Sequence, residues 1–296
     1  MNRVIASLKR ELAISRLKKD FYELFKGIFT WDLAIFAIFP IIITILALFP
    51  DFSANLRLNI HEWRWWQLLT SSFVHIDFEH FIKNILWFLT LFFCQIIIIS
   101  RLNIKRDYLI LFLPTVFLFP IISSIIQILV YPIKVPLLQD TMGSSGIISA
   151  FWGIGYFLVL FALSKKERVI NKYSYYLAIG YICLSILVIY RSKAITIIIG
   201  LLFILFYLYK YLANIKIITR VLGEETHTNS AYSFILIFLF LLFFAAPYVL
   251  FPIKVSDNRG TVDLVVHYMG IIWGLSISYL YLNWKYKKRY LIAKHI

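Results

Sequence analysis

Two short clusters, far apart in the sequence, carry residue types that suit acyl-transfer chemistry. The first is Gly143-Ser144-Ser145-Gly146, which opens a long apolar run. A serine at a helix start is well placed to act as a nucleophile. When it attacks a carbonyl, the negative charge that develops can be stabilised by the first N–H groups of the helix. Glycines beside it let a peptide backbone come close. Taken alone, the cluster is more typical of an ordinary helix start or of a close contact between helices.

The second cluster contains a residue that can serve as the general base for such a serine. One helical face carries a row at spacing i, i+3, i+7: His267, Gly270 and Gly274. A matching row of small residues begins at the serine: Ser145, Ser149 and Gly153. Two helices with small faces can approach backbone to backbone, which a Ser–His hydrogen bond of about 3 Å requires. Asp263 is expected to cap the start of the histidine helix.

A third polar cluster, at the start of another apolar run, has side chains that can stabilise an oxyanion. His80 and Asn84 are four residues apart, so they share a helical face, and both can donate hydrogen bonds. Together with the backbone N–H of Ser145 they can hold the negative oxygen of a tetrahedral intermediate. His75 lies five residues before His80, is expected to point away from it on a helix, and is assigned a structural role. Helix capping or polar bridging between helices is the alternative for all three side chains.

The elements that must position these residues are transmembrane helices. Hydrophobic residues make up 61% of the 296 positions and the mean hydropathy is +0.82, well above soluble domains. A run of about 20 apolar residues can cross a bilayer. Eight such runs are predicted, at residues 32–50, 80–99, 108–130, 145–163, 174–190, 194–213, 231–251 and 263–282. The predicted fold class is therefore all-α, a polytopic transmembrane helical bundle. The outer loops 51–78 and 131–144 are long enough to hold structure.

The formal net charge of +15 is distributed in a way that predicts the orientation of the bundle. When alternate loops are given to alternate sides, most of the 30 Lys and Arg residues fall on the side of the two chain ends. Positive charge is retained in the cytoplasm, so both termini are predicted to be cytoplasmic, which requires an even number of spans. Membrane orientation thus explains the basic composition, and no nucleic-acid partner is expected.

The organisation along the chain is one membrane domain, residues 31–284, between two basic segments. Residues 285–296 are predicted to form a basic cytoplasmic tail. Residues 1–30 are charged and amphipathic, and form either a helix on the inner membrane surface or a poorly ordered tail. They show no cleavable leader, which together with the charge pattern favours a prokaryotic plasma membrane. Cys94 and Cys183 lie within apolar runs, so neither a disulfide framework nor a cysteine metal site is expected.

Taken together, the clusters resemble the rhomboid family of intramembrane serine proteases. The matching pieces stand in the family's order: Leu68-Leu69-Thr70-Ser71-Ser72-Phe73-Val74-His75, His75-x4-His80-x3-Asn84, Gly143-x-Ser145-Gly146 and Asp263-x3-His267-x2-Gly270-x3-Gly274. Each motif is short, but the four in combination are specific. The resemblance covers roughly residues 30–165 and 230–282.

The resemblance implies a rhomboid-like core of six helices and a serine endopeptidase that hydrolyses peptide bonds in or near transmembrane segments. Ser145 would be the nucleophile and His267 the general base, with no acidic third member and no metal or other cofactor. His80 and Asn84 would join the Ser145 N–H in the oxyanion hole. Structural support would come from a further set: Gly143, Gly146, Gly270, Gly274 and His75. The expected partners are a membrane-protein substrate and the lipid bilayer.

The sequence departs from the family's pattern in its first outer loop and in its helix count. The family often has Trp-Arg before Leu-Leu-Thr, whereas Trp66 here precedes Gln67. Either Gln67 or Arg64 is left to take the place of that arginine. Three spans are predicted between the serine and histidine helices where the family core has one, so about two helices are extra.

A third departure concerns the residue that holds the histidine. The family often has an aromatic residue four positions after the serine, where its ring stacks on the histidine, and this chain has Ser149 there. His267 is therefore expected to be held differently, with Tyr268 and Trp152 as candidates.

Three other classes of protein fit the sequence less well. The strongest is a catalytically inactive rhomboid-like protein that binds or escorts membrane clients. Such relatives typically lose the serine or the histidine, and both are present here. A transporter is disfavoured because no internal repeat links the two halves and few charges lie within spans. A metalloprotease is disfavoured because the sequence contains no His-Glu-x-x-His.

Overall fold

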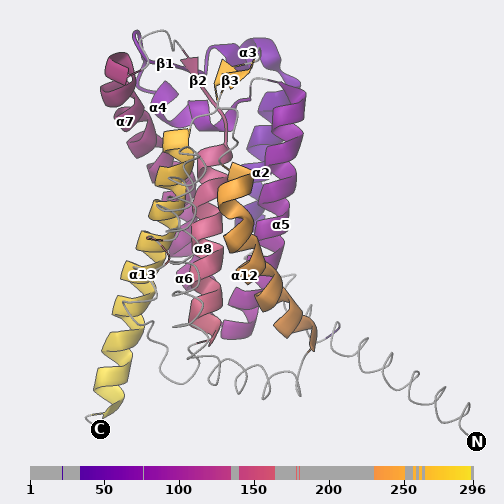
Figure 1. Cartoon of the computed structure of the whole chain (residues 1–296), viewed down its shortest axis with the longest axis vertical. Coiled ribbons are helices and arrows are strands. Elements are labelled where there is room, and N and C mark those ends of the chain that lie inside the picture. Colours follow the sequence, from indigo (N-terminus) through magenta and orange to yellow (C-terminus); the bar gives the residue numbers. More distant parts are fainter. Residues whose placement is uncertain are drawn as a thin grey trace, which may run out of the picture.

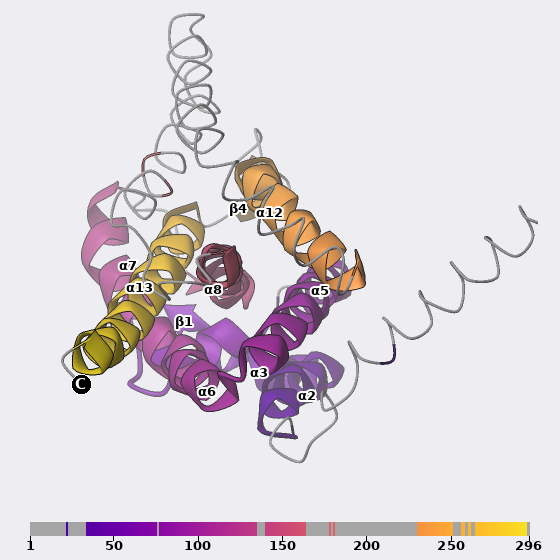
Figure 2. The same ribbon diagram turned by 90° about the horizontal axis from the view of Figure 1, so that it is seen from below.

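The computed structural model of the chain is a helical bundle in which one helix is surrounded by the others (Figures 1 and 2). It describes residues 34–75, 77–134, 140–163, 230–250, 256–257, 260–261 and 264–294, and the single residues 22, 178 and 180. The larger helical elements are α2 (Ala34–Leu48), α5 (Phe78–Leu102), α6 (Lys105–Leu113), the π-helical turn η3 (Pro114–Leu118), α7 (Phe119–Lys134), α8 (Ser145–Leu163), α12 (Ser230–Leu250) and α13 (Leu264–Lys294).

The predicted helical class is confirmed, and so is its membrane character. Four described segments are long and apolar enough to cross a bilayer, namely Phe78–Leu102, Lys105–Val130, Ser145–Ala162 and Leu264–Tyr286, and α2 and α12 are shorter apolar helices. Six of the eight predicted runs coincide with these helices. The runs at 174–190 and 194–213 lie outside the described residues, as does the segment 1–30 apart from Tyr22. The eight spans and the sidedness of the termini stay predictions. The last helix continues into the predicted tail, residues 285–296, as far as Lys294.

The helix that begins at Ser145 is the centre of the bundle. In the view along the helices, α8 is ringed by α5, α6, α7, α12 and α13 (Figure 2). Nearly all of its membrane-length stretch is buried, whereas the outer helices expose apolar side chains such as Leu86 on α5 and Phe234 on α12. Lipid tails are as apolar as leucine, so exposed hydrophobic side chains are the ordinary outer surface of such a bundle.

Small residues bring α8 and α13 into backbone contact. A methyl group added at Gly274 would overlap the carbonyl oxygen of Ala150, and one added at Gly153 would lie 2.8 Å from the backbone nitrogen of Leu275. A methyl group at Gly270 would lie 2.9 Å from Cβ of Ser149. The two helices therefore approach along the small-residue faces expected from the sequence.

The two loops that were predicted to lie on the outer side both contain secondary structure. The first contains α3 (Pro50–Ala54), the strand β1 (Leu58–Asn59), α4 (Gln67–Thr70) and the 3-10 turn η2 (Ser71–Phe73). The second contains β2 (Asp140–Thr141), which pairs antiparallel with β1. A further hairpin, β3 (Ser256–Asp257) with β4 (Gly260–Thr261), lies between α12 and α13. These elements gather at one end of the bundle, here called the loop end, and the C-terminus lies at the other (Figure 1).

The buried Gln95 side chain finds hydrogen-bond partners on two neighbouring helices. The Gln95 side chain donates to the carbonyl oxygen of Phe151 at 2.7 Å and accepts from the Tyr108 hydroxyl at 2.8 Å. Gly155 makes room for it, because a methyl group there would lie 2.9 Å from the Gln95 amide nitrogen. With no water in the hydrocarbon region, such groups must be satisfied internally, so this network fixes α5 against α8.

A second polar cluster joins α6 to α13 at the end opposite the loop end. Asp107 is buried and accepts hydrogen bonds from the hydroxyls of Tyr281 at 2.8 Å and Tyr286 at 2.9 Å. Its carboxylate also forms an ion pair with Lys285. A buried carboxylate needs both a countercharge and donors, and α13 supplies them all.

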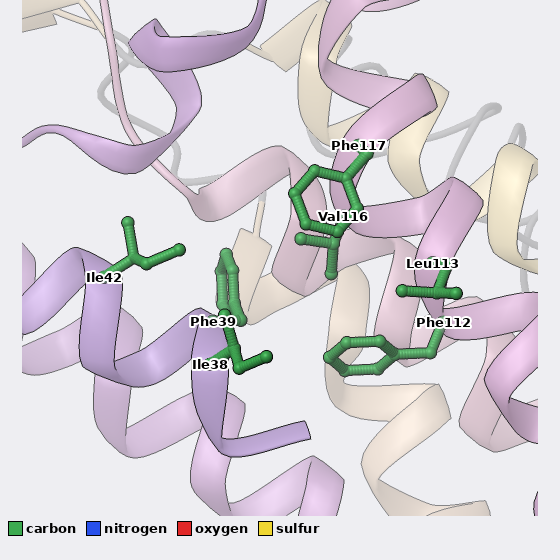
Figure 3. A pocket seen from close by; sticks show the side chains of 7 residues that line it. All are labelled: Ile38, Phe39, Ile42, Phe112, Leu113, Val116 and Phe117. Carbon is green, nitrogen blue, oxygen red and sulfur yellow. The ribbon is translucent and has the colours of Figure 1, made fainter. Parts of the chain in front are cut away.

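A pocket between α2 and the α6–η3 stretch has an entirely apolar lining (Figure 3). Ile38, Phe39 and Ile42 face it from α2, while Phe112 and Val116 are among the side chains across it. Pro114, which lacks a backbone N–H, begins the π-helical turn on that side. The pocket offers no polar group and is therefore not where the predicted chemistry takes place.

Candidate active site

The segment that leads into Ser145 is held from two sides. Gly143 has φ of +121°, a conformation that favours glycine, and its N–H donates to the carbonyl oxygen of Ser71 at 3.0 Å. Just before it, the Thr141 hydroxyl donates to the Gln127 side chain at 2.7 Å. With the β1–β2 pairing, these bonds fix the backbone immediately upstream of Ser145 against the first loop and α7.

His75 supports the neighbouring serine instead of Ser145. Its Nε2 lies 3.0 Å from the hydroxyl oxygen of Ser144, and both side chains are buried. Burial, followed by the charge of the nearby His80, lowers the pKa of His75 to about 3, although Asp77 acts in the opposite direction. The ring is therefore neutral at physiological pH. This geometry is consistent with the structural role expected for His75.

The expectation that His75 points away from His80 is wrong. The two rings lie 5.2 Å apart in an edge-to-face arrangement. The reason is that His75 is not on the helix: α5 begins at Phe78, where the Asp77 side chain accepts from the His80 N–H at 2.7 Å. Helical spacing does not apply to residues that precede such a cap, so the position of the His75 ring could not be inferred from its distance in sequence to His80.

His80 and Asn84 lie in the first turns of α5, and His80 faces the serine segment. A methyl group added at Gly143 would lie 3.0 Å from Cε1 of His80 and 3.9 Å from Oγ of Ser145. The three residues Gly143, His80 and Ser145 are thus gathered at one point. Asn84 is buried, and its Nδ2 has no hydrogen-bond partner in the part of the chain that the structure describes. A buried donor without an acceptor is costly, and Asn84 shares this feature with several other buried polar groups among the described residues.

His267 lies in the first turns of α13, buried beside the start of α8. The residue before it, Val266, contacts the residue after the serine, because a methyl group at Gly146 would overlap a Val266 methyl. One turn along α13, a methyl group at Gly270 would overlap the Gly146 carbonyl oxygen. The structure therefore brings the serine and histidine ends of the two helices together.

The His267 ring has a hydrogen-bond partner that the sequence did not indicate. Its Nδ1 lies 2.5 Å from the carbonyl oxygen of Leu250, the last residue of α12. Of the two residues expected to hold the ring, Trp152 packs its indole against Trp87 with ring centroids 5.3 Å apart. The sequence could not identify Leu250 as this partner, because the acceptor is a main-chain carbonyl and every residue has one.

In the first loop, Gln67 occupies the interior and Arg64 does not. The Gln67 side chain is buried, accepts from the Arg64 N–H at 2.9 Å and donates to the Asn55 carbonyl oxygen at 3.4 Å. Arg64 is exposed, with its guanidinium 5.4 Å from the ring centre of Trp66. Of the two candidates, it is therefore the uncharged Gln67 side chain that packs against the backbone of the first loop. Asp263, the expected cap of the last helix, lies outside the described residues.

The bundle, with polar residues gathered at its loop end, defines an integral membrane protein of the polytopic α-helical class. The family model for the Rhomboid domain matches residues 62–214, just over half of the chain. The chain therefore belongs to the rhomboid family, whose members are generally intramembrane serine proteases. The match includes His80, Asn84 and Ser145 and ends before His267. Searches of curated proteins and of solved structures each found no match.

Proposed function

We propose that this chain is an active intramembrane serine endopeptidase that cleaves membrane proteins in or near their transmembrane segments. Ser145 is the nucleophile and His267 the general base. The observation that carries the proposal is the contact between the first turns of α8 and α13, where Gly146 meets Val266 and Gly270. This contact joins the first turns of the two helices that carry Ser145 and His267, and a Ser–His dyad requires such an approach.

The reaction follows from these positions. Ser145 Oγ attacks the carbonyl carbon of the scissile bond while the His267 ring takes its proton. The carbonyl oxygen becomes negative and accepts hydrogen bonds from Asn84, His80 and the Ser145 N–H. Collapse of the intermediate expels the amine, which receives the proton from His267. Water then hydrolyses the acyl-enzyme by the same two steps.

The substrate and its setting follow from where the dyad lies. A buried site at the loop end of a helical bundle serves a membrane-anchored protein whose transmembrane segment exposes a peptide bond there. The basic loops and chain ends face the cytoplasm, which puts the site near the outer surface of a prokaryotic plasma membrane. The proposed partners are thus a membrane-protein substrate and the bilayer itself.

A fluorophosphonate probe tests the proposal without knowledge of the substrate. The full chain, purified in detergent, is expected to be labelled, with the adduct mapped by mass spectrometry to Ser145 and not to the adjacent Ser144. An active membrane serine protease under the same conditions is the positive control. If that control is labelled and this chain is not, the dyad is unreactive, and binding or escort of membrane clients becomes the better account of the protein.

Replacing Asn84 with alanine is expected to slow labelling by about 10²–10³-fold, the usual cost of losing an oxyanion donor. Stability is expected to stay the same or to rise, because the change removes a buried donor that has no acceptor within the described residues. The measurements are the second-order rate constant of labelling and the thermal unfolding midpoint in detergent.

Asn283 provides a matched control for this change. It is another amide with a buried, unpartnered atom among the described residues, and it lies on α13, 16 positions beyond His267. Asn283→Ala is expected to leave the labelling rate within about twofold of wild type, since the substituted group is about 24 Å along the helix from the dyad. If both variants slowed labelling equally, Asn84 would not be a specific hydrogen-bond donor to the oxyanion.

A further inference from the structure

The contact between His267 and the end of α12 determines which ring nitrogen can act. Nδ1 lies 2.5 Å from the Leu250 carbonyl oxygen, and both residues are buried. A carbonyl oxygen can only accept a hydrogen bond, so the proton of the neutral ring belongs on Nδ1. Nε2 then carries the lone pair, and it is the nitrogen left to accept a proton from a serine hydroxyl.

The position of Leu250 in its helix makes its carbonyl available for this role. Leu250 is the last residue of α12, and the last four carbonyls of a helix have no partner within that helix. The C-terminal end of a helix also carries partial negative charge, which favours a cation placed against it. The acceptor is thus suited to a ring that becomes positively charged during the reaction.

We propose that the main-chain carbonyl of Leu250 is the third member of the catalytic constellation, the orienting acceptor of the general base. The proposal rests on the proposed Ser145–His267 dyad. When the Ser145 proton moves to Nε2, the ring becomes an imidazolium whose Nδ1–H still donates to Leu250. When the leaving amine takes the proton from Nε2, the ring returns to its starting tautomer. Leu250 acts through His267, so it is a positioning residue.

This arrangement makes the alignment of the base depend on how α12 is seated. The ring of Phe243 on α12 stacks on Tyr156 of α8 with centroids 3.7 Å apart, and Ala246 is fully buried. The helix that carries Ser145 therefore also positions α12, which in turn holds His267. One packed unit fixes both the nucleophile and its base.

The first test measures the tautomer of His267 by ¹⁵N NMR of histidine-labelled protein, with the signal assigned by its loss in His267→Ala. The measurement is made in Ser145→Ala, where no Ser145 hydroxyl can impose a tautomer. The Nδ1–H form is expected to remain dominant, because Leu250 still requires it. An unconstrained imidazole favours the Nε2–H form, so a shift to that form in Ser145→Ala would overturn the proposal.

The second test weakens the acceptor itself. Replacing the amide between residues 250 and 251 with an ester turns the Leu250 carbonyl into a poorer acceptor and is expected to slow probe labelling about tenfold. The control is an ester between Val249 and Leu250, which alters another terminal carbonyl of α12, on an exposed residue. That control is expected to label within about twofold of wild type. Equal rates for the two esters would overturn the proposal.

The two tests separate this inference from the proposed protease activity. If wild-type protein is not labelled at Ser145, the dyad fails, while the tautomer in Ser145→Ala still decides whether Leu250 holds the ring. If wild type is labelled but Ser145→Ala shows the Nε2–H form, the proposed protease activity is supported and the proposed role of the Leu250 carbonyl is rejected.

Discussion

Replacing Ser145 with alanine is expected to abolish fluorophosphonate labelling, and replacing His267 with alanine to reduce its rate by at least about 10³-fold. The serine variant has no nucleophile to form the adduct. The histidine variant keeps the hydroxyl but loses the group that removes its proton, and members of such a unit each cost nearly the whole catalytic effect. In-gel fluorescence of the labelled protein measures both losses.

Matched controls separate chemistry from folding. Ser149→Ala removes a hydroxyl one turn further along α8, which donates a hydrogen bond at 2.7 Å to the carbonyl oxygen of Ser145 in its own helix. His61→Ala removes an exposed loop histidine. Both controls are expected to label at close to the wild-type rate. Persistent labelling of Ser145→Ala at another residue would show that a different nucleophile is responsible.

The helical fold could be predicted because the bilayer allows few alternatives. A spanning segment must satisfy its backbone internally, so an apolar run of sufficient length becomes a helix. The runs at 80–99 and 145–163 correspond to α5 and α8 with their ends nearly unchanged. The run at 108–130 is instead part of a longer element, from Lys105 to Lys134, interrupted by a π-helical turn at Pro114. Hydropathy cannot detect the π-helical turn, because the segments on both sides of it are apolar.

The helix-borne part of the site could also be predicted, since periodicity links residues on one face. The small residues around Ser149 and Gly270 do form the contact between α8 and α13. The parts supplied by loops and by backbone atoms could not be predicted. Gln67 takes the interior position through bonds to main-chain atoms of the first loop, and the holder of His267 is a carbonyl of Leu250. Neither depends on a side-chain pattern that repeats along the sequence.

The site depends on a rigid helix pair more than on the loops around it. The α8–α13 contact is continuous from Gly146, at the reactive end, to Gly153 and Leu275 deeper in the bundle. At the far end, Asp107 and Lys285 tie α13 to α6. A base without a carboxylate partner must be oriented by packing and by backbone acceptors, so the proposed catalysis would require the same contacts as folding.

Replacing Gly274 with alanine is therefore expected to destabilise the protein by about 3 kcal/mol, the upper end of the usual cost of overpacking, and to abolish labelling at Ser145. The added methyl group would overlap the Ala150 carbonyl oxygen and lie 2.9 Å from the backbone nitrogen of Ile154. These are main-chain atoms of a central helix, which cannot rotate away as a side chain can, so α13 must move as a whole. Thermal unfolding in detergent and probe labelling measure the two consequences.

Second-site substitutions can test whether the added methyl group collides with a backbone atom or with a side chain. Ala150→Gly should not restore Gly274→Ala, because the obstruction is a carbonyl oxygen that glycine keeps. By contrast, Gly146→Ala meets a Val266 methyl, so Val266→Ala should restore much of its stability. Leu280→Ala, on the exposed face of α13, is expected to change the unfolding free energy by less than about 0.5 kcal/mol. Rescue of Gly274→Ala by Ala150→Gly would mean that side chains, and not backbones, set the distance between the helices that carry Ser145 and His267.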